Sequence, residues 1–370
     1  MSTHWRKVFF ESGLIVGVPD SLLSPFTSLI PLDANHITAV NEGAAVATAA
    51  GFSLLSGKVP LVYMQNSGLG NAINPLMSLA HKKVYACPMV LIVGWRGETD
   101  QVDDSQQDEP QHNSMGLITQ GLLQLLGAEP QVCDENNPLS PELLVNAMEL
   151  ALLRQAPVAL LVRRGAVFAP KTQPVLSESW HQAVPSRREF LEVVAELEDT
   201  FFIATTGHIA REMYAVCKSK GMSSHLFMVT GAMGHVVSIA QGFAISHPNI
   251  RFKVIDGDGS FLMHMGGITA LKKSPNLSYV VLNNRGHASV GGQATADPSL
   301  NIREAIAGIT GITAGLATTT DELRAFLVVS KSAVECITNF ETSPELPRPR
   351  ESHEAMAMEF KKAILEEKDA

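Results

Sequence analysis

Two polar turns separated by one helix length hold residue types that bind metal ions and phosphate. Gly257-Asp258-Gly259 follows a β-branched run, and Asn283-Asn284 follows the next apolar run. In parallel α/β units, such turns lie at the carboxyl ends of neighbouring strands, where these sheets bind ligands. Asp258 and Asn284 offer the hard oxygens that Mg²⁺ prefers, and the glycines let backbone N–H groups approach a phosphate. The pattern predicts a site for a metal-bridged diphosphate.

The strands that position these turns belong to the second of two β/α series. In this series we expect strands at 201–204, 225–229, 279–282 and around Val254-Ile255. Helices are expected at 236–245, 304–307, 321–329 and 351–367, with a single helix between the two polar turns. Strict alternation of strands and helices predicts a parallel sheet.

The first series has the same organisation. Strands are expected at 13–18, 36–40, 59–64, 88–93 and 157–162, with a helix at 44–55, a glycine-rich loop at 66–71 and an exposed acidic loop at 98–111. The stretch 169–185 contains three prolines and little periodicity, so we expect it to link two domains, 1–168 and 186–370. The predicted fold class is α/β, with two tandem doubly wound parallel-sheet domains.

Composition bounds the class of protein. A chain of 370 residues with 45% hydrophobic and 18% charged residues fits two globular domains with large cores. Its net charge of −9 argues against nucleic acid as a partner. The four cysteines form no CxxC pair, and neither a signal peptide nor a run of about 20 apolar residues is present. We therefore expect a cytoplasmic protein with no membrane partner.

The two polar turns, with residues 260–282 between them, resemble the thiamine diphosphate motif. Further blocks resemble the phosphonopyruvate decarboxylase family and also sulfopyruvate decarboxylases: 17–23, 41–45, 94–98, 108–112 and 289–293. The resemblance runs from about residue 13 to about residue 340. A P-loop is excluded because G-x-x-x-x-G-K-[ST] is lacking, and a nicotinamide-dependent dehydrogenase is disfavoured because no G-x-G-x-x-G follows a first strand.

The resemblance implies a pyrimidine-binding domain followed by a diphosphate-binding domain, without a middle domain. It implies two cofactors, thiamine diphosphate and Mg²⁺, with Asp258, Asn284 and the Gly286 carbonyl as metal ligands. The implied diphosphate contacts are Thr206, Gly207, Gly259 and Ser260.

Three more residues match the family's contacts to the cofactor rings. The resemblance gives Glu42 the role of acting on the aminopyrimidine, Gly231 that of accepting a hydrogen bond from it, and Met233 that of supporting the bent cofactor. The alternative role for Glu42 is capping of the helix that follows, because acidic residues favour helix N-termini. The alternative for Met233 is filling of the core.

Decarboxylation ends with a proton transfer, for which general acids are needed. The catalytic candidates besides Glu42 are Asp20, His112 and His287, with both histidines expected in loops at strand ends, although a lone histidine is often structural. Arg96 is the best guanidinium for a phosphonate dianion, and Glu109 and Arg285 are further substrate candidates. The chain departs from the family in extra polar residues at 99–107 and in Arg285-Gly286-His287-Ala288, both bordering the substrate.

The resemblance implies conversion of a small anionic 2-oxo acid, 3-phosphonopyruvate, to phosphonoacetaldehyde and CO₂, in phosphonate or antibiotic biosynthesis. The family's sites lie between two subunits, so the resemblance also implies self-association as at least a homodimer. The same-class alternative is decarboxylation of sulfopyruvate or another 2-oxo acid. The alternative of another class is a non-catalytic cofactor-binding subunit, against which Glu42, Asp258 and Asn284 count.

Overall fold

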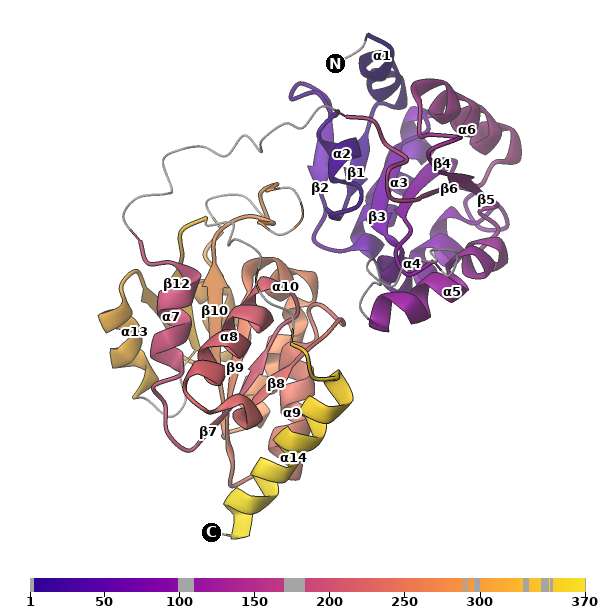
Figure 1. Cartoon of the computed structure of the whole chain (residues 1–370). Helices are drawn as coiled ribbons and strands as arrows, with labels where there is room; N and C mark the ends of the chain where they lie inside the picture. Colours follow the sequence, from indigo (N-terminus) through magenta and orange to yellow (C-terminus); the bar gives the residue numbers. More distant parts are fainter. Residues whose placement is uncertain are drawn as a thin grey trace. The chain divides into compact units, whose positions relative to one another are not determined.

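The apolar runs of the chain assemble into two six-stranded β-sheets, and every strand pair in both is parallel (Figure 1). The computed structural model describes residues 3–98, 110–169, 184–288, 290, 292–295, 300–328, 333–340, 346 and 349–369. The chain divides into two compact units, Met1–Val175 with Val290–Gln293 and Leu176–Ser289 with Ala294–Ala370. Two parallel α/β sheets confirm the predicted fold class. Residues 170–183 of the predicted linker lie outside the described residues.

The sheet of the first unit has the strand order β2-β1-β3-β4-β6-β5. Its strands are β1 (Ile15–Gly17), β2 (His36–Thr38), β3 (Leu61–Gln65), β4 (Met89–Gly94), β5 (Pro130–Cys133) and β6 (Pro157–Val162). Every residue of β4 and β6 is buried, as expected for central strands of a parallel sheet covered on both faces.

Helices cover both faces of this sheet because its crossovers run in both directions. Trp5, Phe26 and Leu144 of α1 (Thr3–Ser12), α2 (Ser24–Thr27) and α6 (Pro141–Arg154) join one core cluster with β1, β3, β4 and β6. The opposite direction of crossover places α3 (Glu42–Ser56) and α5 (Pro110–Leu125) on the other face, where α4 (Leu69–Pro75) packs against α3.

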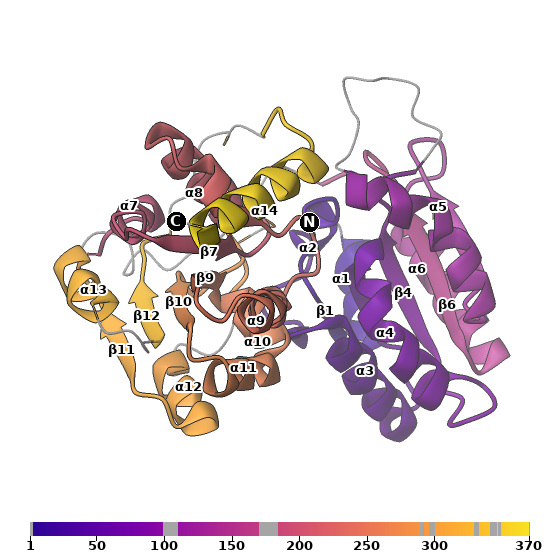
Figure 2. The same ribbon diagram turned by 90° about the horizontal axis from the view of Figure 1, so that it is seen from below.

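The sheet of the second unit has the order β11-β12-β10-β9-β7-β8. Its strands are β7 (Thr200–Ala204), β8 (Leu226–Met228), β9 (Arg251–Gly257), β10 (Leu277–Asn283), β11 (Ala314–Ala317) and β12 (Ala333–Ile337). One core contains α7 (Arg187–Val194), α8 (His208–Ser219) and α13 (Thr320–Leu327). The other contains α9 (Val236–Ser246), α12 (Ile302–Thr310) and α14 (His353–Asp369). Figure 2 shows α7 and α8 on one side of these strands and α12 on the other.

Several segments differ from the sequence-based expectation. The glycine-rich loop expected at 66–71 is a 3₁₀ helix (Asn66–Gly68) followed by the start of α4, and α5 begins at Pro110, within the loop expected at 98–111. The expectation of a single helix between the two polar turns is wrong. The segment instead contains three short elements: α10 (Asp258–Met263), a 3₁₀ helix (Met265–Thr269) and α11 (Ala270–Lys273). Gly266 and Gly267 lie in the 3₁₀ stretch, and glycine weakens an α-helix. Strands β5, β11 and β12 were not expected, because the first two are short and partly exposed and β12 contains the charged Glu335.

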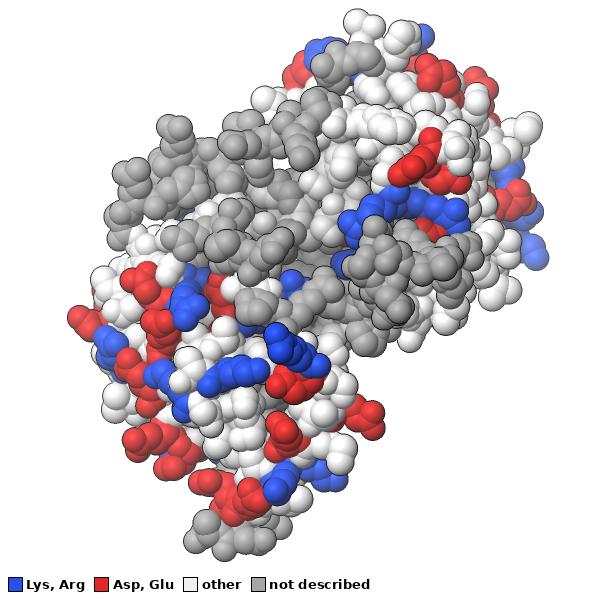
Figure 3. All heavy atoms as spheres, in the orientation of Figure 1, with Lys and Arg blue, Asp and Glu red and all other residues white. Residues whose placement is uncertain are grey.

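On the face shown in Figure 3, positive and negative side chains are mixed: the described Lys and Arg residues are interspersed with Asp and Glu. Among the described residues, none of the helices has the length and hydrophobicity that crossing a bilayer would require.

Candidate active site

The predicted site residues lie at the carboxyl ends of strands in both sheets. In the first unit, Asp20, Glu42 and Arg96 follow β1, β2 and β4. In the second unit, the turns after β7, β8, β9 and β10 carry, in this order, Thr206 and Gly207; Gly231 and Met233; Asp258, Gly259 and Ser260; and Asn284 and Gly286. Glu109 lies outside the described residues. Each unit therefore gathers its predicted residues at the edge where parallel sheets bind ligands.

Glu42 is the first residue of α3 and is buried. Asn41 caps this helix, since its side chain accepts a hydrogen bond from the Ala44 N–H at 2.8 Å. The capping role that the sequence left open for Glu42 thus belongs to Asn41. Glu42 Oε2 instead accepts from Asn71 Nδ2 at 2.8 Å. Burial raises the pKa of Glu42 and the Asn71 bond opposes this, so the carboxyl keeps a proton more readily than an exposed glutamate.

Asp20 is a second buried acid, 2% exposed, in the same unit. Its Oδ2 accepts from the N–H groups of Leu22 and Leu23, at 3.1 and 3.2 Å. Its Oδ1 has no hydrogen-bond partner among the described residues. Burial raises the pKa of Asp20, while the positive charge of Arg96 lowers it. A buried, unpartnered acid oxygen beside a guanidinium is typical of a functional site.

Asn66 fixes the turn that carries Arg96. Asn66 is fully buried, and its Nδ2 donates to the Arg96 carbonyl and to Thr119 Oγ1, each at 2.9 Å. Its Oδ1 accepts from the Arg96 N–H at 3.3 Å. The sequence singled out 66–71 as a glycine-rich loop, whereas the structure has helical turns there, and the contact of Asn66 across 30 positions carried no sequence signal.

His112 was expected in a loop, and this expectation is wrong. His112 lies in the first turn of α5 and is buried, because the helix begins at Pro110, a residue favoured in first turns. Gly97 packs against it so closely that a Cβ on Gly97 would lie 1.8 Å from the His112 carbonyl oxygen. Helix α5 thereby holds His112 beside the Arg96-Gly97 turn.

Asp258 begins α10 in the second unit and is buried. One oxygen, Oδ2, accepts from Thr295 Oγ1 at 2.6 Å. Burial raises the pKa of Asp258 to about 6, against the lowering effect of the Thr295 bond. An anionic Asp258 is therefore costly in the unliganded protein, and a nearby cation would relieve that cost. Nothing in the sequence singled out Thr295.

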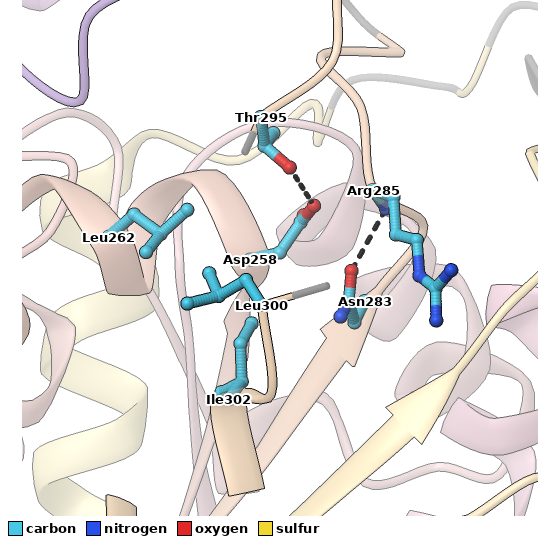
Figure 4. A pocket seen from close by; sticks show the side chains of 7 residues that line it. All are labelled: Asp258, Leu262, Asn283, Arg285, Thr295, Leu300 and Ile302. Carbon is cyan, nitrogen blue, oxygen red and sulfur yellow. Dashed lines mark hydrogen bonds between the residues drawn. The ribbon is translucent and has the colours of Figure 1, made fainter. Parts of the chain in front are cut away.

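The turn after β10 lies next to Asp258. Asn284 Oδ1 accepts from the Gly286 N–H at 3.1 Å, and Arg285 between them has a left-handed backbone with φ of +60°. A cavity of about 10 Å³, room for one water, lies beside Asp258 (Figure 4). Its lining consists of Asp258, Leu262, Asn283, Arg285, Thr295, Leu300 and Ile302. In the part of the chain that the structure describes, no group of three or more His, Cys, Asp or Glu side chains is arranged to hold a metal ion. The predicted ligand set differs from such clusters, having one carboxylate, one amide and one carbonyl.

The turns after β7 and β8 are joined by hydroxyl groups. Thr206 Oγ1 donates to the Thr230 carbonyl at 3.1 Å, and Gly207, with φ of +92°, precedes the 12-residue helix α8. The N-terminus of such a helix favours an anion. The Ser260 hydroxyl, expected to contact diphosphate, lies 2.9 Å from Thr205 Oγ1 and accepts from the Gly234 N–H at 3.1 Å.

Gly231 and Met233 are both partly exposed, so Met233 is not a buried core methionine. His287 lies against Gly259, where an added Cβ would be 3.1 Å from its Cε1. Burial lowers the pKa of His287 to about 4, which makes its imidazole neutral near pH 7. His287 is therefore suited to donate or accept a hydrogen bond rather than to supply positive charge.

Comparison with known proteins identifies two matching domains. Residues 13–115 match the N-terminal TPP binding domain of thiamine pyrophosphate enzymes, and residues 205–311 match the C-terminal TPP binding domain. Together they cover the turns described above in both units.

Individual relatives are similar over most of their length. Phosphonopyruvate decarboxylases of Streptomyces viridochromogenes and Streptomyces hygroscopicus are each 34% identical over 307 residues, which cover 78% of this chain and 74% and 73% of theirs. The sulfopyruvate decarboxylase of Methanosarcina acetivorans is 27% identical over 289 residues, 72% of each chain.

Proposed function

The chain belongs to the family of thiamine diphosphate-dependent decarboxylases that includes phosphonopyruvate decarboxylases, and from this premise we propose that it converts 3-phosphonopyruvate to phosphonoacetaldehyde and CO₂. The observation that carries the proposal is the 34% identity over 78% of the chain, since it spans both units. Removal of the aldehyde product would shift the unfavourable equilibrium of the preceding phosphonate-forming step towards phosphonopyruvate. We therefore place the reaction in phosphonate biosynthesis.

The second unit fits Mg²⁺ and a diphosphate. Asp258 is a buried carboxyl whose pKa is raised to about 6, which is the environment that a bound cation would stabilise. We propose that Asp258, Asn284 and the Gly286 carbonyl hold Mg²⁺, because hard oxygen ligands suit this ion. We propose that the diphosphate is held by two turns, one with Thr206 and Gly207 and the other with Gly259 and Ser260. The N-terminus of α8 favours its negative charge.

The first unit supplies proton chemistry. When bound, thiamine diphosphate supplies a sink for the electron pair that CO₂ leaves behind. Glu42, whose pKa is raised by burial, would hold the proton that it shares with the aminopyrimidine. The Gly231 carbonyl would accept a hydrogen bond from the cofactor, and Met233 would support its rings. Asp20 is the proposed general acid, because its pKa is raised and its Oδ1 is unpartnered among the described residues.

Substrate recognition is assigned to Arg96. The Asn66 side chain bonds both the N–H and the carbonyl of Arg96. These two bonds fix the Arg96 backbone, from which the guanidinium extends close enough to Asp20 to lower its pKa. A guanidinium matches a phosphonate dianion in charge and geometry. His112, beside the Arg96-Gly97 turn of the first unit, is proposed as a further substrate contact, together with Glu109. Arg285 and His287, after β10 of the second unit, are proposed in the same role.

We also propose that the protein self-associates with its active sites at the subunit interface and acts in the cytoplasm. Three leucines of the first unit, Leu32, Leu55 and Leu125, are 95%, 94% and 83% exposed, and such side chains are available for burial against a second copy. All four cysteines are free thiols, as expected in a reducing compartment.

The test is CO₂ release from 3-phosphonopyruvate, sulfopyruvate and pyruvate, each with thiamine diphosphate and Mg²⁺ present and then omitted. We expect cofactor-dependent turnover with the highest kcat/KM on phosphonopyruvate. Arg96→Gln should raise the KM for phosphonopyruvate about 10- to 100-fold, the range for losing a hydrogen bond to a charged group. Arg164→Gln, which alters an exposed arginine of the same unit, is the matched control.

Preference for sulfopyruvate would keep the cofactor assignment and overturn the substrate. That outcome has support in the similarity to the Methanosarcina sulfopyruvate decarboxylase and in the divergent segment 285–288. Cofactor binding without turnover on any 2-oxo acid would overturn the proposed reaction.

A further inference from the structure

The two asparagines of the Asn283-Asn284 pair have different surroundings. Asn284 is partly exposed in the turn next to Asp258, whereas Asn283 is 4% exposed and makes three hydrogen bonds to other parts of the chain. Asn283 Nδ2 donates to Glu335 Oε1 at 2.7 Å, and its Oδ1 accepts from the Arg285 N–H at 2.9 Å. Its carbonyl accepts from the Thr338 N–H at 3.0 Å. Asn283 thus connects the turn to strand β12.

Glu335 is an unusual residue for the interior of a parallel sheet. It lies on β12, is 3% exposed, and uses both carboxylate oxygens. Oε1 accepts from Asn283, and Oε2 accepts from the Arg303 N–H at 2.8 Å, in the first turn of α12. A buried carboxylate is retained at a cost, which only specific donors offset. Glu335 therefore joins β12, α12 and the turn after β10 at one point.

The turn that Glu335 reaches is conformationally demanding. Arg285 has φ of +60°, a region that residues with a side chain seldom adopt. The bond from its N–H to Asn283 Oδ1 holds this conformation, and the next N–H, of Gly286, donates to Asn284 Oδ1 at 3.1 Å. If Asn283 turned, Arg285 would lose its constraint, and Asn284 and the Gly286 carbonyl would move with it.

We propose that Glu335 is a positioning residue for the metal and diphosphate site, acting through Asn283. This inference rests on the proposed function, because it assigns the Mg²⁺ ligands to Asp258, Asn284 and Gly286. The hydrogen bonds of the Glu335 carboxylate go to Asn283 and to the Arg303 N–H, and neither residue is a proposed Mg²⁺ ligand. Its carboxylate orients the Asn283 side-chain amide, the amide fixes Arg285, and the turn presents its oxygens in one arrangement.

The experiment measures binding of Mn²⁺ with thiamine diphosphate to the full-length protein by electron paramagnetic resonance, beside the melting temperature and kcat at saturating Mn²⁺. Glu335→Gln keeps the shape of the side chain but replaces one acceptor oxygen with an amide N–H₂ group. This donor must then face another donor, either Asn283 Nδ2 or the Arg303 N–H. We expect Mn²⁺ affinity to fall 10- to 100-fold, as for the loss of groups that orient metal ligands. At saturating Mn²⁺, kcat should return to within about threefold of the wild-type value.

Two further variants separate positioning from general stability. Glu304→Gln alters an exposed glutamate in the same turn of α12 and should leave Mn²⁺ affinity unchanged. In the double variant Glu335→Gln with Asn283→Asp, the new amide at position 335 can donate to the new carboxylate at position 283 while accepting from Arg303. This reversal keeps all three hydrogen bonds and should restore most of the Mn²⁺ affinity.

Unchanged Mn²⁺ affinity in Glu335→Gln would overturn the proposal. A fall in affinity that the double variant fails to restore, with melting temperatures equal to wild type, would overturn it as well. If the wild-type protein binds Mn²⁺ and thiamine diphosphate but does not act on phosphonopyruvate, the proposed substrate fails, while the affinities still decide the role of Glu335.

Discussion

Among single residues, Glu42 is a buried carboxyl that the surrounding structure accommodates at some cost. Burial raises its pKa, and the hydrogen bond from Asn71 offsets only part of the desolvation. A residue that serves stability alone would more often be apolar at such a position. The environment of Glu42 therefore indicates function rather than packing.

We predict that Glu42→Gln lowers kcat about 10²- to 10⁴-fold, the usual contribution of a proton-transferring group. The glutamine can still accept from Asn71 and carries no buried charge, so the melting temperature should be equal or higher. Steady-state kinetics and calorimetry check this, with thiamine diphosphate binding as the control. A variant that keeps more than a tenth of the wild-type kcat would remove Glu42 from the proposed mechanism.

From the raised pKa of Asp258 we predict that the stability of the unliganded protein depends on pH. Burial raises the Asp258 pKa to about 6, above its value of 3.8 in the unfolded chain. Between these pH values the native state binds more protons than the unfolded state, so the free energy of unfolding falls as pH rises. The loss, up to about 3 kcal/mol, is complete above pH 6.

Urea unfolding from pH 4 to pH 7 should therefore show this loss in the wild-type protein without metal, and Asp258→Asn should remove it. Since protons and Mg²⁺ compete for the same carboxylate, Mg²⁺ affinity should fall about tenfold for each pH unit below 6. Equal pH dependence in both proteins would show that the raised pKa of Asp258 does not govern stability.

At the level of elements, the segment from Asn66 to α4 controls the space around Glu42. Gly68 lies at the N-terminus of α4 with φ of −70°, a conformation open to any residue. A Cβ there would nevertheless lie 2.3 Å from Glu42 Oε1. The glycine is needed for close approach, not for backbone freedom. Gly70, one position into the same helix, has no atom within 4 Å of an added Cβ.

Gly68→Ala should displace the Glu42 carboxyl and reduce kcat/KM at least tenfold, because catalytic groups lose efficiency when moved by about 1 Å. Gly70→Ala is the matched control: it should leave kcat/KM unchanged and stabilise the helix by up to about 1 kcal/mol. Kinetics and thermal unfolding of both variants decide the outcome. Equal kcat/KM values for Gly68→Ala and Gly70→Ala would mean that the position of the Glu42 carboxyl does not limit catalysis.

For the whole molecule, the proposal that active sites form between subunits makes activity depend on concentration. If one subunit supplies Glu42 and the other Asp258, a monomer lacks a complete site. We predict that specific activity falls on dilution in parallel with the fraction of dimer, and that added thiamine diphosphate and Mg²⁺ shift both towards the dimer. Mass photometry beside initial rates at the same concentrations measures this. A fully active monomer would contradict the shared site.

The sequence by itself predicted two parallel α/β sheets and the turns that carry Asp258 and Asn284. It could do so because strand and helix periods, glycines and polar turn residues are local features. The same local reasoning missed β12, because the charged side chain of Glu335 interrupts its apolar run and concealed a strand that is mostly buried. It also placed His112 in a loop, because the helix start at Pro110 lay within a polar stretch.

Only the tertiary structure decided which neighbour each site residue has. Asn66 holds Arg96 across 30 positions, Thr295 binds Asp258 across 37, and Glu335 reaches Asn283 across 52. The structure also distinguished Asn283, bonded within the protein, from Asn284 in the turn. The first and third of these pairs form where neighbouring strands of a sheet, β3 with β4 and β10 with β12, bring distant segments together, and the second forms where a segment after β10 folds back on α10. Sequence spacing therefore predicts the edge on which a residue lies, and packing between distant segments determines what it touches.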